Sequence, residues 1–315
     1  MSALGIAGGV LQAIVVVVGA PLLQGLMRQV RARLEGRVGP GIGQPWRDLR
    51  KLLRKQSIVP RGTTEIFRIA PVLLVAMTLV VVVVAPLVTT ASAVPPIADL
   101  FVVVALLAHA TVVIALAALD GGTAFGGMGA SREVTILALV EPTALVAIFA
   151  LSVPTGSTSL PTIVGTALDD PQRLLSPTSL LAAVALATVI VAETGRLPVD
   201  NPATHLELTM IHEAMVLEYA GPDLALVELG SAMRLSVYLG LFTSLFLPWG
   251  MATTATPLAL AVGVLALVAK VAVLGVVMAA AEVFLAKLRL FRVPELLAGS
   301  FLLALLAVTT AYLLG

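Results

Sequence analysis

The segment from Glu193 to Gly221 gathers an unusual share of the titratable groups of this 315-residue chain. It reads ETGRLPVDNPATHLELTMIHEAMVLEYAG, and apolar segments flank it on both sides. Its ionisable residues are Glu193, Arg196, Asp200, His205, Glu207, His212, Glu213 and Glu218. Because charged groups at a membrane boundary are retained mainly for a task, this segment predicts the inner mouth of a proton path, a docking surface for a redox partner, or both.

A second set of ionisable residues lies deeper, inside apolar segments. Its members are His109, Glu141, Glu228, Arg234 and Lys270. Glu141 precedes a proline, which removes a backbone donor and frees the carbonyl of Ala138 for water. We therefore predict a proton path through Glu141, Glu193 and Glu228, assisted by Lys270 and Arg234. The alternative is that Glu141 only forms an ion pair with Arg234 or Lys270.

The remaining buried charges require partners. Arg234 cannot usefully lose its proton, so we expect an acidic partner from the fourth or fifth apolar segment. Lys270 should either lose its proton or find an acidic partner. We expect Glu282 to pair with Lys287 and Arg289, and His109 to be either a hydrogen-bonded core histidine or a proton shuttle.

Metal and phosphate sites are not predicted. His212-Glu213 lacks the second histidine of a zinc-binding H-E-x-x-H motif, because Val216 stands in its place. The glycines between 121 and 129 follow no strand, which favours a turn between helices. The chain has no cysteine, so it cannot hold an iron–sulfur cluster, a thiolate-bound nickel or a disulfide. Any redox chemistry belongs to partner subunits.

These residues must be positioned by membrane helices. The chain is 59% hydrophobic and 12% charged, with a mean hydropathy of +1.07, whereas soluble chains carry about 25% charged residues. The apolar residues form long runs, which predicts an all-α integral membrane protein with one polytopic domain over residues 1–315. We predict eight spans, at about 3–27, 67–90, 98–119, 133–153, 178–196, 224–247, 257–284 and 295–314.

The distribution of lysine and arginine predicts the orientation. Of the 19 basic residues, 17 fall in or near the loops after spans 1, 3, 5 and 7. These loops are therefore predicted to be cytoplasmic and both termini to lie outside. The loop after span 1 should contain an amphipathic helix from Trp46 to Gln56 that lies on lipid or forms a platform for a soluble partner. The loop after span 5 should contain a helix of about four turns between Thr204 and Gly221.

Several loop motifs resemble subunit 1 of respiratory NADH dehydrogenase and its hydrogenase relatives. The motifs are RLEGRVGP at 33–40, QPWRDLRKL at 44–52, SRE at 131–133 with Glu141-Pro142, and ETGRLPVD at 193–200. The segment DNPATHLELTMIHEAMVLEYAG is most similar to the formate hydrogenlyase subunit 4 branch, the membrane anchor of energy-converting NiFe hydrogenases. The resemblance covers nearly the whole chain and implies a multi-pass protein of a prokaryotic inner membrane.

The resemblance also implies partners. The loops after spans 1, 3 and 5 would contact a small iron–sulfur subunit and a NiFe-type large subunit, and antiporter-like subunits would lie beside the chain in the membrane. Glutamates 141, 193, 228, 207, 213 and 218 would belong to an acidic channel. The docking residues would be Arg33, Arg37, Gly39, Pro40, Gln44, Asp48, Lys51, Arg132, Glu133, Arg196, His205 and His212.

We therefore expect a non-catalytic anchor and coupling subunit of a hydrogenase-like complex, with iron–sulfur clusters and nickel–iron in its partners. A quinone-reactive subunit of an NADH dehydrogenase is the first alternative, although the histidine-bearing loop weakens the case for quinone. A stand-alone transporter and a purely structural anchor are the others. The transporter would predict internal pseudo-symmetry or paired broken helices, and the sequence shows no internal repeat.

Overall fold

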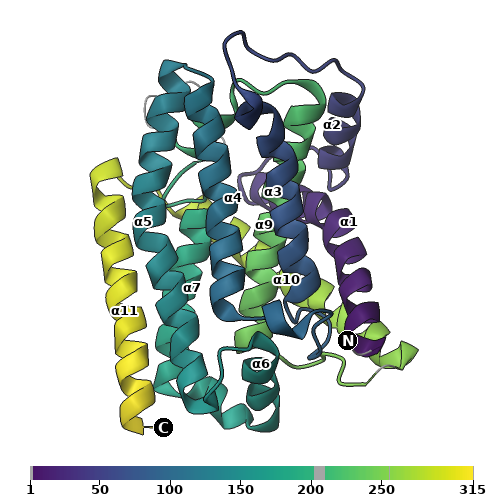
Figure 1. Ribbon diagram of the computed structural model, residues 1–315, viewed down its shortest axis with the longest axis vertical. Coiled ribbons are helices and arrows are strands. Elements are labelled where there is room, and N and C mark those ends of the chain that lie inside the picture. Colours follow the sequence, from purple (N-terminus) through teal and green to yellow (C-terminus); the bar gives the residue numbers. More distant parts are fainter. Residues whose placement is uncertain (1–2, 202–209, 255, 315) are drawn as a thin grey trace.

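The computed structural model describes residues 3–201, 210–254 and 256–314, and these residues form a bundle of helices (Figure 1). The α-helices are α1 (Ala3–Leu34), α2 (Gln44–Leu53), α3 (Glu65–Val84), α4 (Leu100–Asp120), α5 (Ala124–Ser152), α6 (Leu160–Asp169), α7 (Pro177–Glu193), α8 (His212–Val216), α9 (Gly221–Phe246), α10 (Pro257–Phe284) and α11 (Val293–Leu314). Short 3-10 helices lie at Pro95–Ile97, Val153–Thr155, Pro171–Leu175 and Leu290–Arg292.

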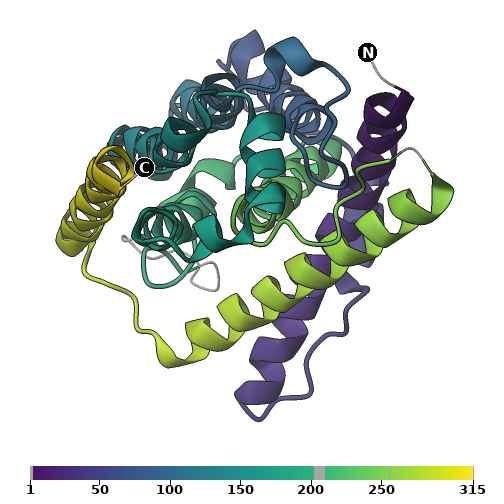
Figure 2. The same ribbon diagram turned by 90° about the horizontal axis from the view of Figure 1, so that it is seen from below.

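Seven of the described helices are long and apolar enough to cross a membrane: α1, α3, α4, α5, α9, α10 and α11. They correspond to seven of the eight predicted spans. The eighth prediction falls on α7, which is apolar but only 17 residues long. Figure 2 shows α9 and α7 toward the middle of the bundle, with α10 crossing α1 obliquely on the outside. The bundle is therefore built around α9, whose side chains are the most enclosed.

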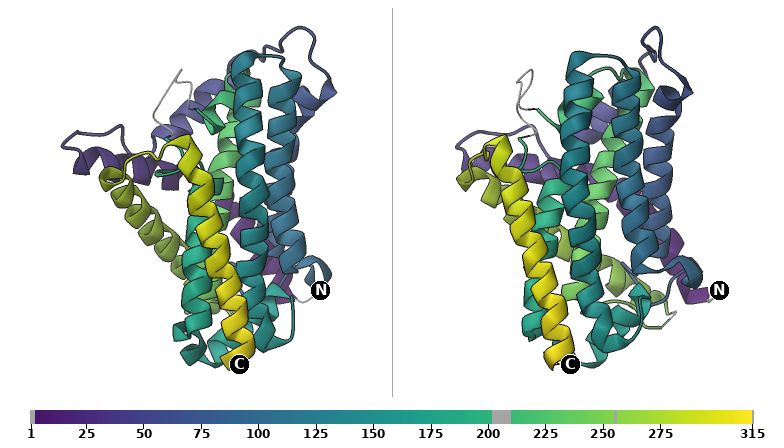
Figure 3. Two further views of the ribbon diagram at one scale, coloured as in Figure 1. Left: turned by 90° about the vertical axis from the view of Figure 1, so that its left-hand side faces the viewer. Right: turned by 60° about the vertical axis from the view of Figure 1, so that its left-hand side comes forward.

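Both ends of the described chain lie at the same end of the bundle (Figure 3). The arginine-rich connection between α1 and α3, the α4–α5 turn and the segment after α7 lie at the opposite end. This arrangement gathers the loops that carry charge on one side of the helices. In the described part of the chain, buried apolar residues form two clusters: a large one that draws on α1, α3, α4, α5, α7 and α9, and a smaller one that includes Phe67, Leu74 and Tyr219.

Close approach of α3 and α9 depends on a glycine. A Cβ added at Gly230 would lie 2.7 Å from the side chain of Leu74, so any larger residue would push the two helices apart. Near the loop end, Tyr219 stacks on Phe67, with 4.3 Å between ring centroids, and donates its hydroxyl to the Phe67 carbonyl at 2.9 Å. These contacts fix the start of α9 against α3.

The first loop is folded back on α1 before it enters α2. Gln29 donates to the Val38 carbonyl at 2.8 Å and accepts the amide of Gly41 at 2.9 Å. Gly39 adopts a φ of +78°, and a Cβ there would collide with the Gln29 side chain. The helix α2 that follows buries Pro45 and Leu49 and leaves its basic residues exposed.

The expected four-turn helix after α7 is only partly covered by the structure. Residues 202–209, which include His205 and Glu207, lie outside the described residues. The described part contains the short helix α8, which begins at His212 and ends at Val216.

Candidate functional site

A buried ion pair joins three helices at the centre of the bundle. Arg234 Nη2 lies 2.6 Å from Glu193 Oε2, and both side chains are almost fully enclosed. The same carboxylate oxygen accepts the hydroxyl of Tyr238 at 3.1 Å, while Arg234 Nη2 also donates to Thr111 Oγ1 at 2.6 Å. Glu193 belongs to α7, Thr111 to α4, and the other two to α9. The prediction that Arg234 pairs with an acid from a neighbouring segment is confirmed.

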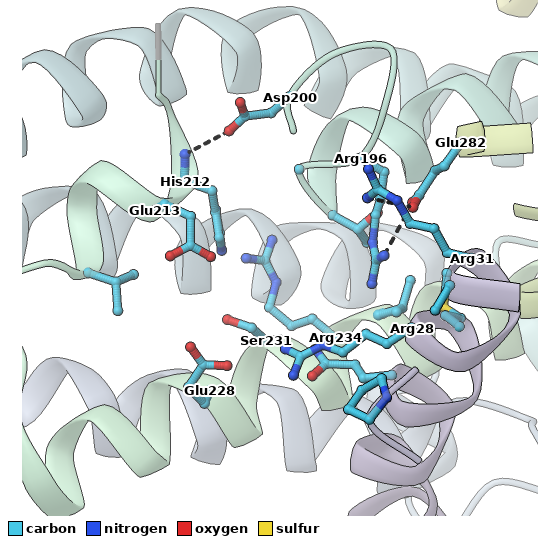
Figure 4. Close-up of a pocket in the computed structure, with 18 of the residues that line it drawn as sticks. Arg28, Arg31, Arg196, Asp200, His212, Glu213, Glu228, Ser231, Arg234 and Glu282 are labelled. Carbon is cyan, nitrogen blue, oxygen red and sulfur yellow. Dashed lines mark hydrogen bonds and ion pairs between the residues drawn. The ribbon is translucent and has the colours of Figure 1, made fainter. Parts of the chain in front are cut away.

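A cavity of about 710 Å³ reaches this pair from the loop end (Figure 4). Its walls come from α1, the end of α7, α8 and α9, with contributions from the first loop and the end of α10. Its ionisable lining residues are Arg28, Arg31, Glu35, Arg37, Glu193, Arg196, Asp200, His212, Glu213, Glu228, Arg234 and Glu282. A volume of this size is typical of small-molecule sites and is ample for a chain of water molecules.

Two carboxylates in this cavity have no partner among the described residues. Glu213 and Glu228 line it and make no hydrogen bond or ion pair with any other described residue. Arg28 on the opposite wall likewise makes none within the described residues (Figure 4). Charged groups that are half-buried and unpaired require water, so the cavity is polar and hydrated at this level.

Paired charges form another part of the cavity lining. Glu282 lies 3.2 Å from Arg196 Nη1 and 3.8 Å from Arg31 Nη1, and Arg31 also contacts Glu35 at 2.9 Å. The sequence prediction that Glu282 pairs with Lys287 and Arg289 was wrong in its partners. The end of α10 turns Glu282 toward α1 and the segment after α7, while Lys287 in the following loop reaches a different acid.

That acid is Asp200, which holds the loop around α8. Its Oδ1 accepts Lys287 Nζ and the Asn201 amide, each at 2.8 Å. Its Oδ2 accepts the backbone amides of Ile211 and His212 at 3.3 Å and 3.2 Å. Asp200 was predicted to lie on the proton path, but these four donors occupy its carboxylate and fix the cavity wall.

His212 faces a second buried carboxylate. Its Nδ1 lies 3.9 Å from Glu133 Oε1, and Glu133 is buried on α5. Burial alone would lower the histidine pKa, but the Glu133 carboxylate outweighs it and raises the pKa above the ordinary value. Glu133 was predicted to dock a partner; its burial instead places it inside, next to the cavity wall.

The other predicted proton-path residues lie away from the cavity. Glu141 is half-buried lower on α5 and makes no hydrogen bond or ion pair with any described residue. Glu218 lies against the α4–α5 turn at Gly121. His109 is exposed on α4, and its Nδ1 contacts the carbonyl of Ala105 in its own helix at 2.7 Å, so it is not a core histidine.

Comparison with known proteins identifies the family. The model of the NADH dehydrogenase family matches residues 8–313. This chain belongs to the NADH dehydrogenase family. Formate hydrogenlyase subunit 4 of Escherichia coli (strain K12) is 36% identical over 298 residues, or 94% of this chain and 95% of the relative. Hydrogenase-4 component C of the same organism is 34% identical over 296 residues, or 94% and 92%.

One solved structure carries the same fold. A chain of the membrane-bound sulfane sulfur reductase, an archaeal respiratory membrane complex, superposes with a TM-score of 0.80. It is 23% identical in sequence, and the match covers 96% of this chain and 99% of that one. The likeness supports the bundle architecture across the whole chain, and the resemblance that the loop motifs suggested is confirmed by the family match and by the two relatives.

For this member of the NADH dehydrogenase family, the predicted docking residues separate into two groups. Arg33, Arg37, Pro40 and Lys51 are exposed at the loop end. Gly39, Gln44, Asp48, Arg132, Arg196 and His212 are half-buried, and several of them have internal bonds, such as Gln44 to Asp48 at 2.8 Å and Arg132 to the Met210 carbonyl at 3.0 Å. The exposed group is the part available for contact with a partner.

No three side chains of histidine, aspartate or glutamate converge as a metal site in the part of the chain that the structure describes. The chain itself contains no cysteine. Within the described ranges, the cavity instead brings two carboxylates without a protein partner close to buried carboxylates that have fixed neighbours.

Lys270 has a structural role that the sequence did not suggest. Instead of an acid, its ammonium donates to the carbonyls of Leu247 and Trp249 at 2.8 Å and 3.0 Å, just beyond the end of α9. Carbonyls at a helix C-terminus favour a cation.

We expect Lys270→Met to lower the free energy of unfolding by about 1.5–3 kcal/mol, because two charge-assisted bonds are lost. Proton movement per electron should be unchanged, since the residue lies at the end of α9 opposite the cavity. Unfolding in mixed micelles and proton uptake by reconstituted vesicles measure the two quantities. A stable variant with impaired proton movement would return Lys270 to the proton path.

Proposed function

We propose that this chain is the membrane-anchor and coupling subunit of a hydrogenase-like redox complex, of the formate hydrogenlyase type. It holds a cytoplasmic arm that carries the electron-transfer groups, and it passes protons from the cavity toward neighbouring membrane subunits. The two relatives at 36% and 34% identity, each matched over more than 90% of both chains, support the class of complex. The cavity supports the coupling role.

The proposal includes a topology. All eight apolar helices cross the membrane, with α7 as the eighth: its 17 residues extend about 25 Å at 1.5 Å per residue, which approaches the thickness of the hydrocarbon core. The basic loops face the cytoplasm and both termini lie outside, as the excess of lysine and arginine at one end favours. The whole chain, residues 1–315, acts as a single domain.

The exposed basic residues of the first loop and α2 make the partner surface. Arg33, Arg37 and Lys51 are exposed, and Arg37 also lines the cavity. A small iron–sulfur subunit and a NiFe-type large subunit would sit there and close the cavity from the cytoplasmic side, while antiporter-like subunits would contact the lateral helices. The clusters belong to those partners, because the chain offers no thiolate.

The observation that supports the coupling role is that Glu213 and Glu228, beside the buried Glu193–Arg234 pair, have no partner among the described residues. Hydrated carboxylates can collect protons, and enclosed ones can hold them when the nearby charge changes. In this path Glu133 takes the place that the sequence gave to Glu141, because Glu133 is buried at the level of the cavity wall.

Glu228→Gln tests the proposal. We expect assembly with the soluble arm to be retained, because Glu228 has no protein partner to lose among the described residues, and proton movement per electron to fall to background. The measurement is dye-monitored proton uptake by vesicles that contain the purified complex, with a viologen as the electron carrier. Glu295→Gln, an exposed acid on α11, is the matched control. If Glu228→Gln keeps normal proton movement per electron, the proposed proton path is wrong.

A quinone site is the second candidate, and one feature favours it. A smaller cavity of about 160 Å³ under α2 shares Gln24, Arg28 and Glu228 with the large one and adds the apolar residues Pro21, Leu49 and Leu52. Together they could admit an amphipathic ring from the membrane side. Stoichiometric quinone in solvent extracts of the purified complex would support this candidate, and its absence would leave the cavity to water.

A further inference from the structure

His212 stands between the cavity and Glu133. The histidine lines the cavity, whereas Glu133 does not line it and lies on α5, next to the histidine. The side chain of Glu133 is only 7% exposed, and its ion pair with His212 is the only one that it forms with a described residue. A proton from cavity water therefore meets the imidazole before it meets this carboxylate.

The imidazole of His212 lies close to Glu133 but is not hydrogen-bonded to it. Its Nδ1 is buried without a hydrogen bond to any described residue, and the gap to Glu133 Oε1 is 3.9 Å. A direct hydrogen bond between these atoms requires about 2.8–3.0 Å, so a side-chain movement of about 1 Å completes it. A buried donor without a partner costs about 1–3 kcal/mol, so this cost favours formation of the hydrogen bond between His212 and Glu133.

The backbone of His212 is fixed by the segments around it. Its amide donates to Asp200, which Lys287 neutralises. A Cβ added at Gly195 would lie 3.4 Å from the Cβ of His212, so the turn after α7 supports the residue from one side. The ring position is thus set by the segment that follows α7, which lies at the loop end where partners would dock.

We propose that His212 is the proton-transfer group that connects the cavity to Glu133, an inference that rests on the proposed coupling function. In the forward step the Nδ1–H bond of the imidazolium breaks and an O–H bond forms on Glu133, leaving a neutral imidazole protonated at Nε2. The ring then turns to the cavity and takes a proton from hydronium at Nδ1, leaving water. One proton moves from the cavity to Glu133, and no electron is transferred.

The surrounding charges suit this step. Glu133 on α5, Glu213 on α8 and Glu193 on α7 favour the imidazolium, while Arg234 on α9 opposes it. The balance of these charges raises the pKa of the His212 imidazole above its ordinary value. The protonated imidazole stabilises the folded state. This stabilisation is fully present below about pH 6.5, the pKa of an unfolded histidine, and is lost as the pH rises through the higher pKa of the folded state.

His212→Gln tests the inference in the reconstituted complex, with His109→Gln as the matched control, since His109 is exposed and distant from the cavity. We expect redox turnover and assembly to persist and coupled proton transfer to slow by about 100-fold, the usual range for a lost general acid. Millimolar imidazole added to the vesicles should restore part of the rate in His212→Gln and none in Glu133→Gln. A structural role for His212 would give no such rescue.

The outcomes separate the two proposals. If Glu133→Gln and Glu228→Gln lose coupling while His212→Gln transfers protons as fast as His109→Gln, the inference is overturned and the coupling function stands. If Glu133→Gln and Glu228→Gln both keep full coupling, the coupling function itself fails. A second readout is independent of turnover: after a pH jump, the infrared band of the protonated Glu133 carboxyl, identified by its loss in Glu133→Gln, should rise more slowly in His212→Gln. An unchanged rise would also overturn the inference.

Discussion

Replacing Arg234 with glutamine is expected to lower the free energy of unfolding by about 3–5 kcal/mol, the largest stability effect of any single change at this site. The arginine is buried, lies 2.6 Å from Glu193 Oε2 and also donates to Thr111. Its removal leaves an uncompensated carboxylate among α4, α7 and α9. That carboxylate must then take up a proton or draw water into the core.

The double variant Arg234→Gln/Glu193→Gln is expected to recover most of the loss, because two neutral amides need no counter-charge. Unfolding in mixed detergent micelles would measure the four corners of the cycle. Arg173→Gln is the control: Arg173 pairs with Asp170 at 3.0 Å but both are half-exposed, so its change should stay within about 0.5 kcal/mol. A double variant as unstable as the single one would show that the pair does not act as a unit.

The ion pair also shows how far the sequence could lead. A buried arginine in an apolar run requires an acid, and only a few acids lie in neighbouring segments, so the partner segment could be predicted. Thr111 and Tyr238 could not, because a hydroxyl in an apolar run has no pattern that distinguishes a ligand of a charge from a residue bonded to its own helix. Only packing of α4 and α9 against α7 brings them to the same oxygen.

Glu133 and Glu141 illustrate a second limit. They are eight residues apart on α5, which rotates one about 80° from the other around the helix axis. The sequence favoured Glu141 because of the adjacent proline, but the direction in which each side chain points is set by how α5 packs on α4 and α7. The structure turns Glu133 toward His212 and leaves Glu141 away from the cavity.

Long-range partners in loops were the least predictable. Glu282 was matched with Lys287 because they are close in sequence, yet Lys287 reaches Asp200, which lies 87 residues away. In the first loop, by contrast, the local sequence determines the backbone, since Gly39 and Gly41 adopt positive φ angles that other residues avoid.

Asp200→Asn is expected to release the loop that carries His212. An asparagine offers one acceptor oxygen and replaces the other with an amide NH2 group, which cannot accept a hydrogen bond from a backbone amide or from Lys287. The two oxygens of Asp200 accept Lys287 and the amides of residues 201, 211 and 212, so at least one contact set is lost in either orientation of the side chain. The loss of two charge-assisted hydrogen bonds should increase the equilibrium constant for local opening of this loop by about 100-fold or more.

Hydrogen exchange of the peptide that contains Ile211 and His212 measures this opening. Lys287→Met keeps the bonds from Asp200 to both amides, so its effect on exchange should be smaller. Asp170→Asn, which alters an exposed pair at the other end of the bundle, should have none. Because His212 needs a fixed backbone to reach Glu133, proton transfer should fall together with protection in Asp200→Asn. If exchange is fast but coupled proton transfer is undiminished, the position of α8 does not control proton transfer. If protection and proton transfer are both lost, the anchoring of this loop is required for the movement of protons through the cavity.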